Sequence, residues 1–181
     1  MRALRVRMYS RMPVKRPLFP ALLILGVLVV PARAAAESIS RSLAGLKLGS
    51  SPNKVRAAYP PKTGEELFRG DVRMEIDRKS SSKIPDDIDR ILLGFRDGRL
   101  ARVQVIYQRE ESKKKPLAKR VIEASLEYGE PRRSGLDYFW LDSRTVFVLF
   151  EAPVPIEGSR GVELRVSAEV LEREAFDART E

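Results

Sequence analysis

The sequence predicts an α+β fold, in which an antiparallel sheet carries about two helices on one face, after an N-terminal signal segment. Residues 52–59 and 116–128 place apolar side chains three and four positions apart, as amphipathic helices do. Residues 72–77 and 162–170 instead alternate apolar with polar or charged side chains, which is the pattern of strands with one solvated face. Each predicted helix is followed by three predicted strands, a plan that implies helices on one face of an antiparallel sheet.

Residues 1–36 have the organisation of a secretory signal peptide. They contain seven basic residues and no acidic one, and an uncharged, mostly apolar run at residues 17–32 is followed by small residues that end at Ala36. An uncleaved membrane anchor is the alternative, but a span needs about 20 apolar residues. We therefore expect cleavage near Ala36, a single domain at residues 37–181, and an extracytoplasmic location, either periplasmic or secreted.

Composition limits the partners of the remaining domain. The net charge of +9 comes mostly from the leader, because residues 37–181 keep 27 of the 34 basic residues and all 25 acidic ones. A nucleic-acid interface needs basic charge gathered on one surface, so no nucleic-acid partner is predicted. The membrane is expected as a partner only through the signal segment, if that segment is not cleaved. Since the chain has no Cys, its stability must come from the core.

In the first half of the domain, a helix at residues 52–59 opens with Pro52 after the N-cap candidate Ser51. A strand follows at residues 72–77, then a polar loop at residues 79–89. Next comes a hairpin formed by residues 91–95 and 101–107. A three-residue turn, with Gly98 left-handed in a bulge, would put the apolar residues of both strands on one face, so this turn is predicted.

In the second half, a charged connector at residues 109–115 leads to the helix at residues 116–128, which Gly129 ends. Strands are predicted at residues 136–141, 145–150 and 162–170. The stretches at about 52–107 and 116–170 thus share one plan of a proline-opened helix and three strands. This approximate repeat predicts two αβββ-like halves that share one sheet.

Short motifs resemble those of a known family. Residues 46–56, with Gly49-Ser50-Ser51 before the first helix, look like the opening of small envelope domains of the SmpA/OmlA kind, which also occur in tandem in β-lactamase inhibitory proteins. The Phe-Arg-Asp-Gly stretch at residues 95–98, and the Tyr-Gly-Glu-Pro stretch at residues 128–131 with its later Trp140, are similar to further motifs of these domains. The chain departs from them in lacking a lipidated cysteine and in showing one helix per half. The resemblance implies protein binding outside the cytoplasm without catalysis, and it assigns a role to no residue.

The residue types present exclude most catalytic chemistries. The chain has neither His nor Cys, which removes catalytic triads with histidine, thiolate nucleophiles and histidine-ligated zinc. Asp86, Asp87 and Asp89 have oxygen ligands for Ca²⁺, but their spacing matches no calcium loop, so no metal or cofactor is predicted. We predict no enzymatic activity; a hydrolase that uses a pair of carboxylates remains as a further alternative.

The aromatic residues near the end of the chain suggest a binding surface. Residues 136–141 and 146–150 are apolar on both faces, so they are expected to be doubly covered strands in the middle of the sheet, flanked by the strands with one solvated face. The second cover could be residues 43–48, residues 171–176, a protein partner or a second copy of the chain. The predicted function is an exported, non-enzymatic protein-binding domain of the cell envelope, and the alternative is an extracytoplasmic carrier or sensor of a small ligand. The candidate partner-binding residues are Tyr138, Trp140 and Phe147.

Overall fold

The computed structural model of the chain describes residues 38–60, 66–68, 71–78, 81 and 83–180, and for residues 66–68, 71, 72, 179 and 180 it describes the backbone alone. All of these residues belong to one compact unit. The predicted signal segment at residues 1–36 lies outside the described residues, so its cleavage stays a prediction.

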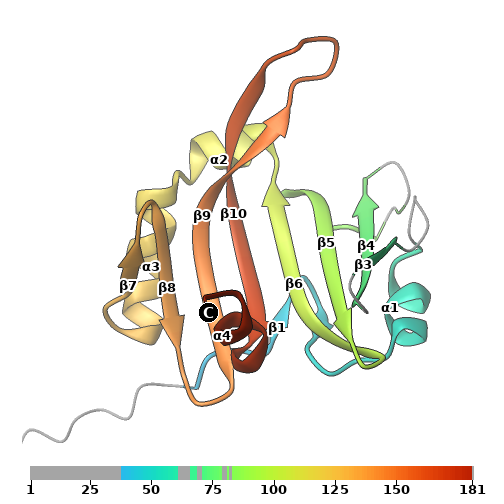
Figure 1. Cartoon of the computed structure of the whole chain (residues 1–181). Helices are drawn as coiled ribbons and strands as arrows, with labels where there is room; N and C mark the ends of the chain where they lie inside the picture. Colours follow the sequence, from blue (N-terminus) through green and yellow to red (C-terminus); the bar gives the residue numbers. More distant parts are fainter. Residues whose placement is uncertain (1–37, 61–65, 69–70, 79–80, 82, 181) are drawn as a thin grey trace, which may run out of the picture. The chain divides into compact units, whose positions relative to one another are not determined.

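The described part of the chain contains four helices and ten strands in the order shown in Figure 1. The helices are α1 (Pro52–Ala58), α2 (Arg109–Lys114), α3 (Leu117–Tyr128) and α4 (Arg173–Thr180). The strands are β1 (Ser42–Leu43), β2 (Leu46–Lys47), β3 (Glu66–Phe68), β4 (Asp71–Asp77), β5 (Ile88–Arg96), β6 (Arg99–Tyr107), β7 (Arg132–Ser134), β8 (Asp137–Leu141), β9 (Thr145–Pro155) and β10 (Val162–Glu172).

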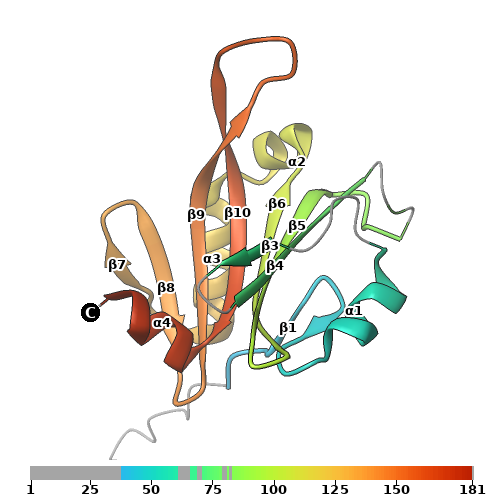
Figure 2. The ribbon, with the colours of Figure 1, turned by 45° about the vertical axis from the view of Figure 1, so that its right-hand side comes forward.

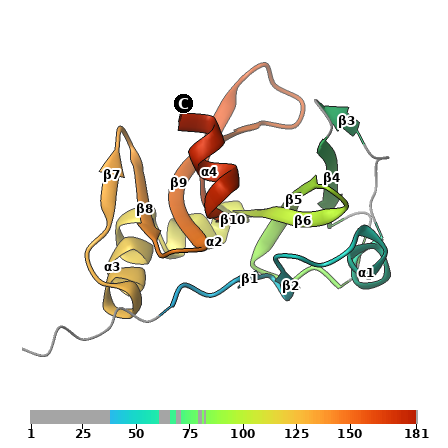
Figure 3. The same cartoon turned by 60° about the horizontal axis from the view of Figure 1, so that its bottom comes forward.

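Eight of the strands form one antiparallel sheet in the order β3-β4-β5-β6-β10-β9-β8-β7, and β1 and β2 form a separate small hairpin. The fold is therefore α+β. Figure 3 shows α1, α3 and the β1–β2 hairpin along one face of the sheet and α4 on the other. The face that carries α1 and α3 holds the main core, which includes Val55 of α1, Ala124 of α3 and the fully buried Val103 and Val105 of β6.

The two predicted long helices form where the apolar spacing places them. In α1, Pro52 occupies the first helical position and Val55 is buried, whereas Ser51 is the N-cap residue but makes no capping hydrogen bond through its side chain. In α3, the stripe that ends at Tyr128 faces the sheet, and Gly129 follows with a φ of +84°, a conformation that glycine adopts without strain.

The β5–β6 hairpin corrects the predicted turn. Arg96 pairs with Arg99, so the loop has two residues, and Asp97 and Gly98 both have positive φ values of +49° and +71°. This is the geometry of a type I′ turn, whose twist matches that of the strands. The β-bulge lies at Ala101 and not at Gly98, because Phe95 pairs with Leu100 and Gly94 with Arg102, which leaves Ala101 as the extra residue of β6. Leu93 still pairs with Val103 on the core side, so the predicted apolar face forms.

Several elements differ from the sequence-based prediction. The connector at residues 109–115 is mostly helical (α2), and a short edge strand, β7, precedes β8. Strand β10 is not a flanking strand: it lies between β6 and β9, and residues 166–171 are all buried. Its polar residues are tolerated there because they bond to β6, where the Ser167 hydroxyl donates to the Val105 carbonyl at 2.8 Å.

Strands β9 and β10 also extend beyond their neighbours. Residues 151–155 of β9 and 162–166 of β10 pair only with each other, since the pairing of β8 with β9 stops at Leu149 and that of β6 with β10 begins at Ser167. This two-stranded arm projects past the rest of the sheet in Figure 2. Its base packs on β5 and β6 through Ala152 and Val154.

Candidate functional site

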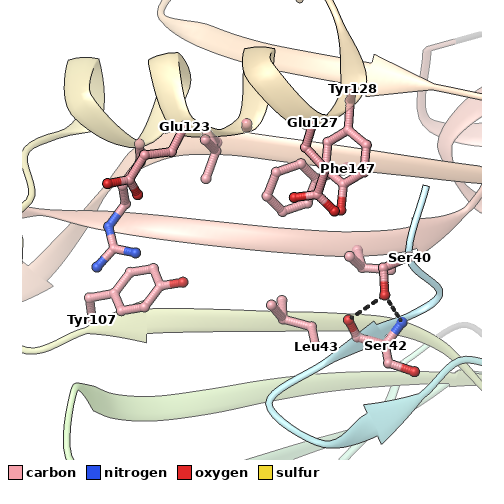
Figure 4. Close-up of a pocket in the computed structure, with 12 residues that line it drawn as sticks. Ser40, Ser42, Leu43, Tyr107, Glu123, Glu127, Tyr128 and Phe147 are labelled. Carbon is pink, nitrogen blue, oxygen red and sulfur yellow. Dashed lines mark hydrogen bonds between the residues drawn. The ribbon is translucent and has the colours of Figure 1, made fainter. Parts of the chain in front are cut away.

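A groove lies between α3 and the leading segment of the domain (residues 38–48), above the centre of the sheet. Its volume is about 230 Å³. Leu43, Ala124, Phe147, Leu149 and Val170 are the apolar residues that line it. The polar lining residues are Ser40, Ser42, Tyr107, Arg120, Glu123, Glu127 and Tyr128 (Figure 4).

Hydrogen bonds hold the leading segment in place as one wall of this groove. The Ile39 backbone N–H donates to Asp142 Oδ2 at 2.9 Å, and Arg41 Nη2 donates to Glu172 Oε1 at 2.7 Å. Ile39, Leu46 and Leu48 are buried in the main core, so the segment is fixed by apolar packing as well. One of the two predicted intramolecular covers, residues 43–48, therefore does lie over the sheet, on the α3 face.

Tyr107, at the end of β6, contributes a hydroxyl to the groove. The residue is 9% exposed, and no described residue forms a hydrogen bond with its hydroxyl group. In Figure 4 this hydroxyl points along the groove toward Leu43. Burial raises the pKa of Tyr107 above its ordinary value of 10.0, and the nearby Arg120 opposes this in part. The group is thus a neutral donor and acceptor at physiological pH.

Arg120 closes the same end of the groove. Its guanidinium carbon lies 3.6 Å from the centroid of the Tyr107 ring, a cation–π arrangement. Arg120 Nη2 donates to Glu111 Oε1 at 3.2 Å, which ties α3 to α2. Within the described part of the chain its Nε atom is buried without a hydrogen-bond partner. The positive charge of Arg120 therefore interacts with Glu111 of α2 and with the Tyr107 ring.

Two carboxylates stand one helical turn apart on the groove side of α3. Glu123 lies 3.7 Å from Lys115 Nζ, an ion pair that compensates its charge. Glu127 is exposed, and no described cationic group lies within ion-pair distance of it. Like charges at this spacing disfavour a helix by a few tenths of a kcal/mol, so α3 tolerates this arrangement at a small cost.

The three predicted partner-binding residues share one face of the sheet but differ in burial. Tyr138 and Trp140 of β8 pair with Leu149 and Phe147 of β9, so all of these side chains face α3. Trp140 is 3% exposed, and its Nε1 donates to the Gly129 carbonyl at 2.7 Å. Phe147 is half-buried and lines the groove, and Tyr138 is half-buried outside it.

The burial of Trp140 has a direct cause in the packing of α3. The Tyr128 ring contacts both Trp140 and Phe147 edge-on, at centroid distances of 6.5 and 5.7 Å. Helix α3 thus covers the face of β8 and β9 that carries Trp140 and Phe147, a cover that the sequence alone does not identify. On the opposite face, Phe176 of α4 covers Phe139 at 5.7 Å. Of the three candidates, Phe147 is the one that the fold brings into the groove.

Exposed apolar side chains occur in two further places. Ile122 and Leu126 lie one turn apart on α3, and Leu136 follows in the β7–β8 turn. The arm presents Val162 and Leu164, each 62% exposed, on the same face as the prolines opposite them in β9.

A charged cleft of about 420 Å³ lies beneath the arm, between β4, β5 and β10. Its charges form ion pairs: Asp89 accepts from both Arg90 and Arg165 at 3.1 Å, and Arg90 also binds Glu75. No group of three or more potential metal ligands occurs in the residues that the structure describes. The loop carboxylate Asp86 pairs with Arg78.

Comparisons with known proteins identify no relative: no family model, curated protein or solved structure matches the chain. None of the helices formed by the described residues is long and apolar enough to cross a membrane.

Proposed function

We propose that the chain is an exported, non-enzymatic protein-binding domain of the cell envelope, and that it contacts its partner at the groove between α3 and the leading segment. The observation that carries this proposal is the groove itself. It combines an apolar floor with polar groups at its rim, and it includes the hydroxyl of the mostly buried Tyr107, which has no hydrogen-bond partner among the described residues.

The size of the groove favours a protein partner over a whole small molecule. Sites for drug-sized ligands usually enclose about 300–1,000 Å³. The groove, at about 230 Å³, is smaller and has exposed residues such as Ser42 and Glu127 at its rim. These dimensions suit one side chain of a partner polypeptide, while the surrounding rim would contact its backbone.

Two alternatives use the same groove. An extracytoplasmic carrier or sensor would hold a small ligand there, and the apolar floor is compatible with this. A hydrolase would use Glu123 and Glu127 as its carboxylate pair. A general acid needs a carboxyl group that stays protonated near neutral pH, which burial normally provides. Because both glutamates are exposed, the hydrolase has weaker support.

The family resemblance and the internal repeat belong to the same proposal. We infer that residues 52–107 and 116–170 are two related halves. The strand order supports this, because β3–β6 occupy one side of the sheet and β7–β10 the other in mirrored sequence. A tandem domain of the SmpA/OmlA kind would have such halves, and protein binding is what that resemblance implies.

A photocrosslinking amino acid at Ser42, an exposed groove residue, tests the proposal in cells of the native host. The expected result is one specific protein adduct, which should weaken when Phe147→Ala is combined with the crosslinker. The same crosslinker at the exposed Arg99 of the β5–β6 hairpin is the matched control and should give no such adduct.

Export is tested on the same material. Protein from the extracytoplasmic fraction should begin at or near Glu37 when its N-terminus is sequenced. A single adduct that depends on the groove supports the proposal; equal labelling from Ser42 and Arg99, or no adduct at all, contradicts it. A full-length chain found in the cytosol would contradict export.

A further inference from the structure

We propose that the groove between α3 and the leading segment accepts a basic side chain, lysine or arginine, of the partner protein. This inference rests on the proposed function and specifies the chemistry that the groove recognises. The methylene stem of the basic side chain would lie on the apolar floor, and its charged end would lie beside Glu127.

Charge complementarity is the first argument. Three charged residues line the groove, Arg120, Glu123 and Glu127. Two of them have ion-pair partners outside it, since Arg120 pairs with Glu111 and Glu123 with Lys115. Glu127 is left over, with no ion-pair partner in the part of the chain that the structure describes. The groove therefore carries an uncompensated negative charge at the Tyr128 end, and Figure 4 shows the Glu127 side chain directed from α3 toward the leading segment.

The hydroxyl of Tyr107 is the second, independent argument. Tyr107 as a residue is only 9% exposed, and its hydroxyl points into the groove and bonds to no described group. A hydroxyl that faces a groove from an otherwise buried residue can donate or accept a hydrogen bond with a group that enters the groove. The Tyr107 oxygen can accept an N–H from the backbone amide that flanks the basic side chain, because Tyr107 lies at the Arg120 end of the groove and Glu127 at the Tyr128 end.

The floor of the groove selects for the rest of the side chain. Leu43, Ala124 and Phe147 offer apolar surface, which suits the methylene stems of lysine and arginine. The Tyr128 ring at the rim adds a face to which a cation is attracted. An acidic side chain would meet Glu127 and Glu123, and a purely apolar one would leave the charge of Glu127 uncompensated.

The test measures the binding of small probes of defined chemistry to the processed chain purified from its native host. Nα-acetyl-lysine methylamide, whose ε-ammonium group is free, is compared with Nα-acetyl-norleucine methylamide, which has the same stem without the charge. The corresponding glutamate compound is the third probe. Binding is followed by NMR through the amide signals of residues 40–43 and 123–128. The lysine probe is expected to bind about five- to tenfold more tightly than the norleucine probe, and raising the salt concentration should weaken only the lysine probe.

Matched variants assign the effect to Glu127. Glu127→Gln keeps the shape and removes the charge, so the preference for lysine over norleucine should disappear. Glu174→Gln, at an exposed carboxylate on α4, should leave it unchanged. Tyr107→Phe should weaken the binding of the lysine and the norleucine probe alike, because both contain the backbone amide. Equal binding of lysine and norleucine, or a lysine preference that survives Glu127→Gln, would overturn the inference.

The results separate this inference from the proposed function. A groove-dependent protein adduct together with equal probe binding overturns the basic-side-chain inference and leaves protein binding intact. Lysine-selective probe binding without any adduct supports the basic group and overturns the protein partner in favour of a small cationic ligand. When both experiments succeed, the crosslinked peptide should contain lysine or arginine close to the site of attachment.

Discussion

The indole Nε1 of Trp140 donates a hydrogen bond of 2.7 Å to the carbonyl oxygen of Gly129. This bond joins β8 to the residue that ends α3. It gives a buried indole the partner that its N–H requires, and it satisfies a carbonyl next to the C-terminus of a helix. Trp140 thereby acts as an anchor that holds α3 over the sheet, which in turn forms one wall of the groove.

Replacing Trp140 by phenylalanine should destabilise the domain. The substitution removes the hydrogen bond to Gly129 and leaves unfilled volume beside Tyr128, at an expected cost of about 1–3 kcal/mol in the free energy of unfolding. Urea denaturation, followed by far-UV circular dichroism, measures this loss. Tyr138→Phe on the same strand face is the control and should change stability by less than about 0.5 kcal/mol. Equal stability of both variants would contradict the anchoring role.

Tyr107 should make stability depend on pH in the alkaline range. Because burial raises the pKa of Tyr107 in the folded state, the unfolded chain loses this proton first as the pH rises past 10.0. The contribution of this group is thus fully present below pH 10.0 and is lost as the pH rises through the higher folded pKa. Unfolding free energies of the wild type and Tyr107→Phe, compared between about pH 9 and pH 11, should diverge as the wild type loses stability faster. Parallel profiles would contradict this prediction.

Ser167 should be essential to the buried polar contacts between β6 and β10. It is fully buried, accepts from Gln104 Nε2 at 3.1 Å and donates to the Val105 carbonyl at 2.8 Å. Ser167→Ala leaves the Gln104 amide without this acceptor, so a loss of about 1–3 kcal/mol is expected in chemical denaturation. Ser125→Ala removes a hydroxyl that bonds only within α3 and should cost much less. Similar losses of stability for the two variants would contradict the prediction that the Ser167 bonds between β6 and β10 contribute more than the Ser125 bond within α3.

Local patterns in the sequence are sufficient to predict most of the elements and the α+β class. The helix at residues 117–128 follows from its apolar stripe, and the apolar faces of β5 and β6 follow from alternation. The central position of β10 could not be predicted from alternation, because Ser167 and Glu169 look like solvated residues. Their burial depends on partners in β6, such as Gln104, that are more than sixty positions away.

The candidate site was predictable only in part. The sequence predicts Phe147 as a partner-binding residue because it is aromatic and lies on a strand that is apolar on both faces, and Phe147 does line the groove. Tyr107, Arg120 and Glu127 are not predicted from the sequence, because they come to line one groove only when α3 packs on β9, Arg120 reaches Tyr107 and the leading segment closes the other side. The one local signal was that Arg120, Glu123 and Glu127 recur at three- and four-residue spacing, which places them on one side of a helix.

The C-terminal helix should be required to shield the second face of the sheet. Phe176 of α4 packs on Phe139, and with it covers the buried Val146 and Leu171. Phe176→Ala should lower the free energy of unfolding by about 1–3 kcal/mol, less than for a fully buried phenylalanine because the side chain is half-exposed.

The same variant should also expose apolar surface, seen as stronger binding of the dye ANS. Glu174→Ala, at an exposed position of the same helix, separates loss of this contact from general fraying of α4 and should be nearly neutral in both assays. If Phe176→Ala has the same free energy of unfolding and the same weak ANS binding as Glu174→Ala, the face of the sheet opposite α3 is covered by something other than α4. Since the crosslinker at Ser42 reports on the α3 face only, its adduct should persist in Phe176→Ala as long as the sheet remains folded.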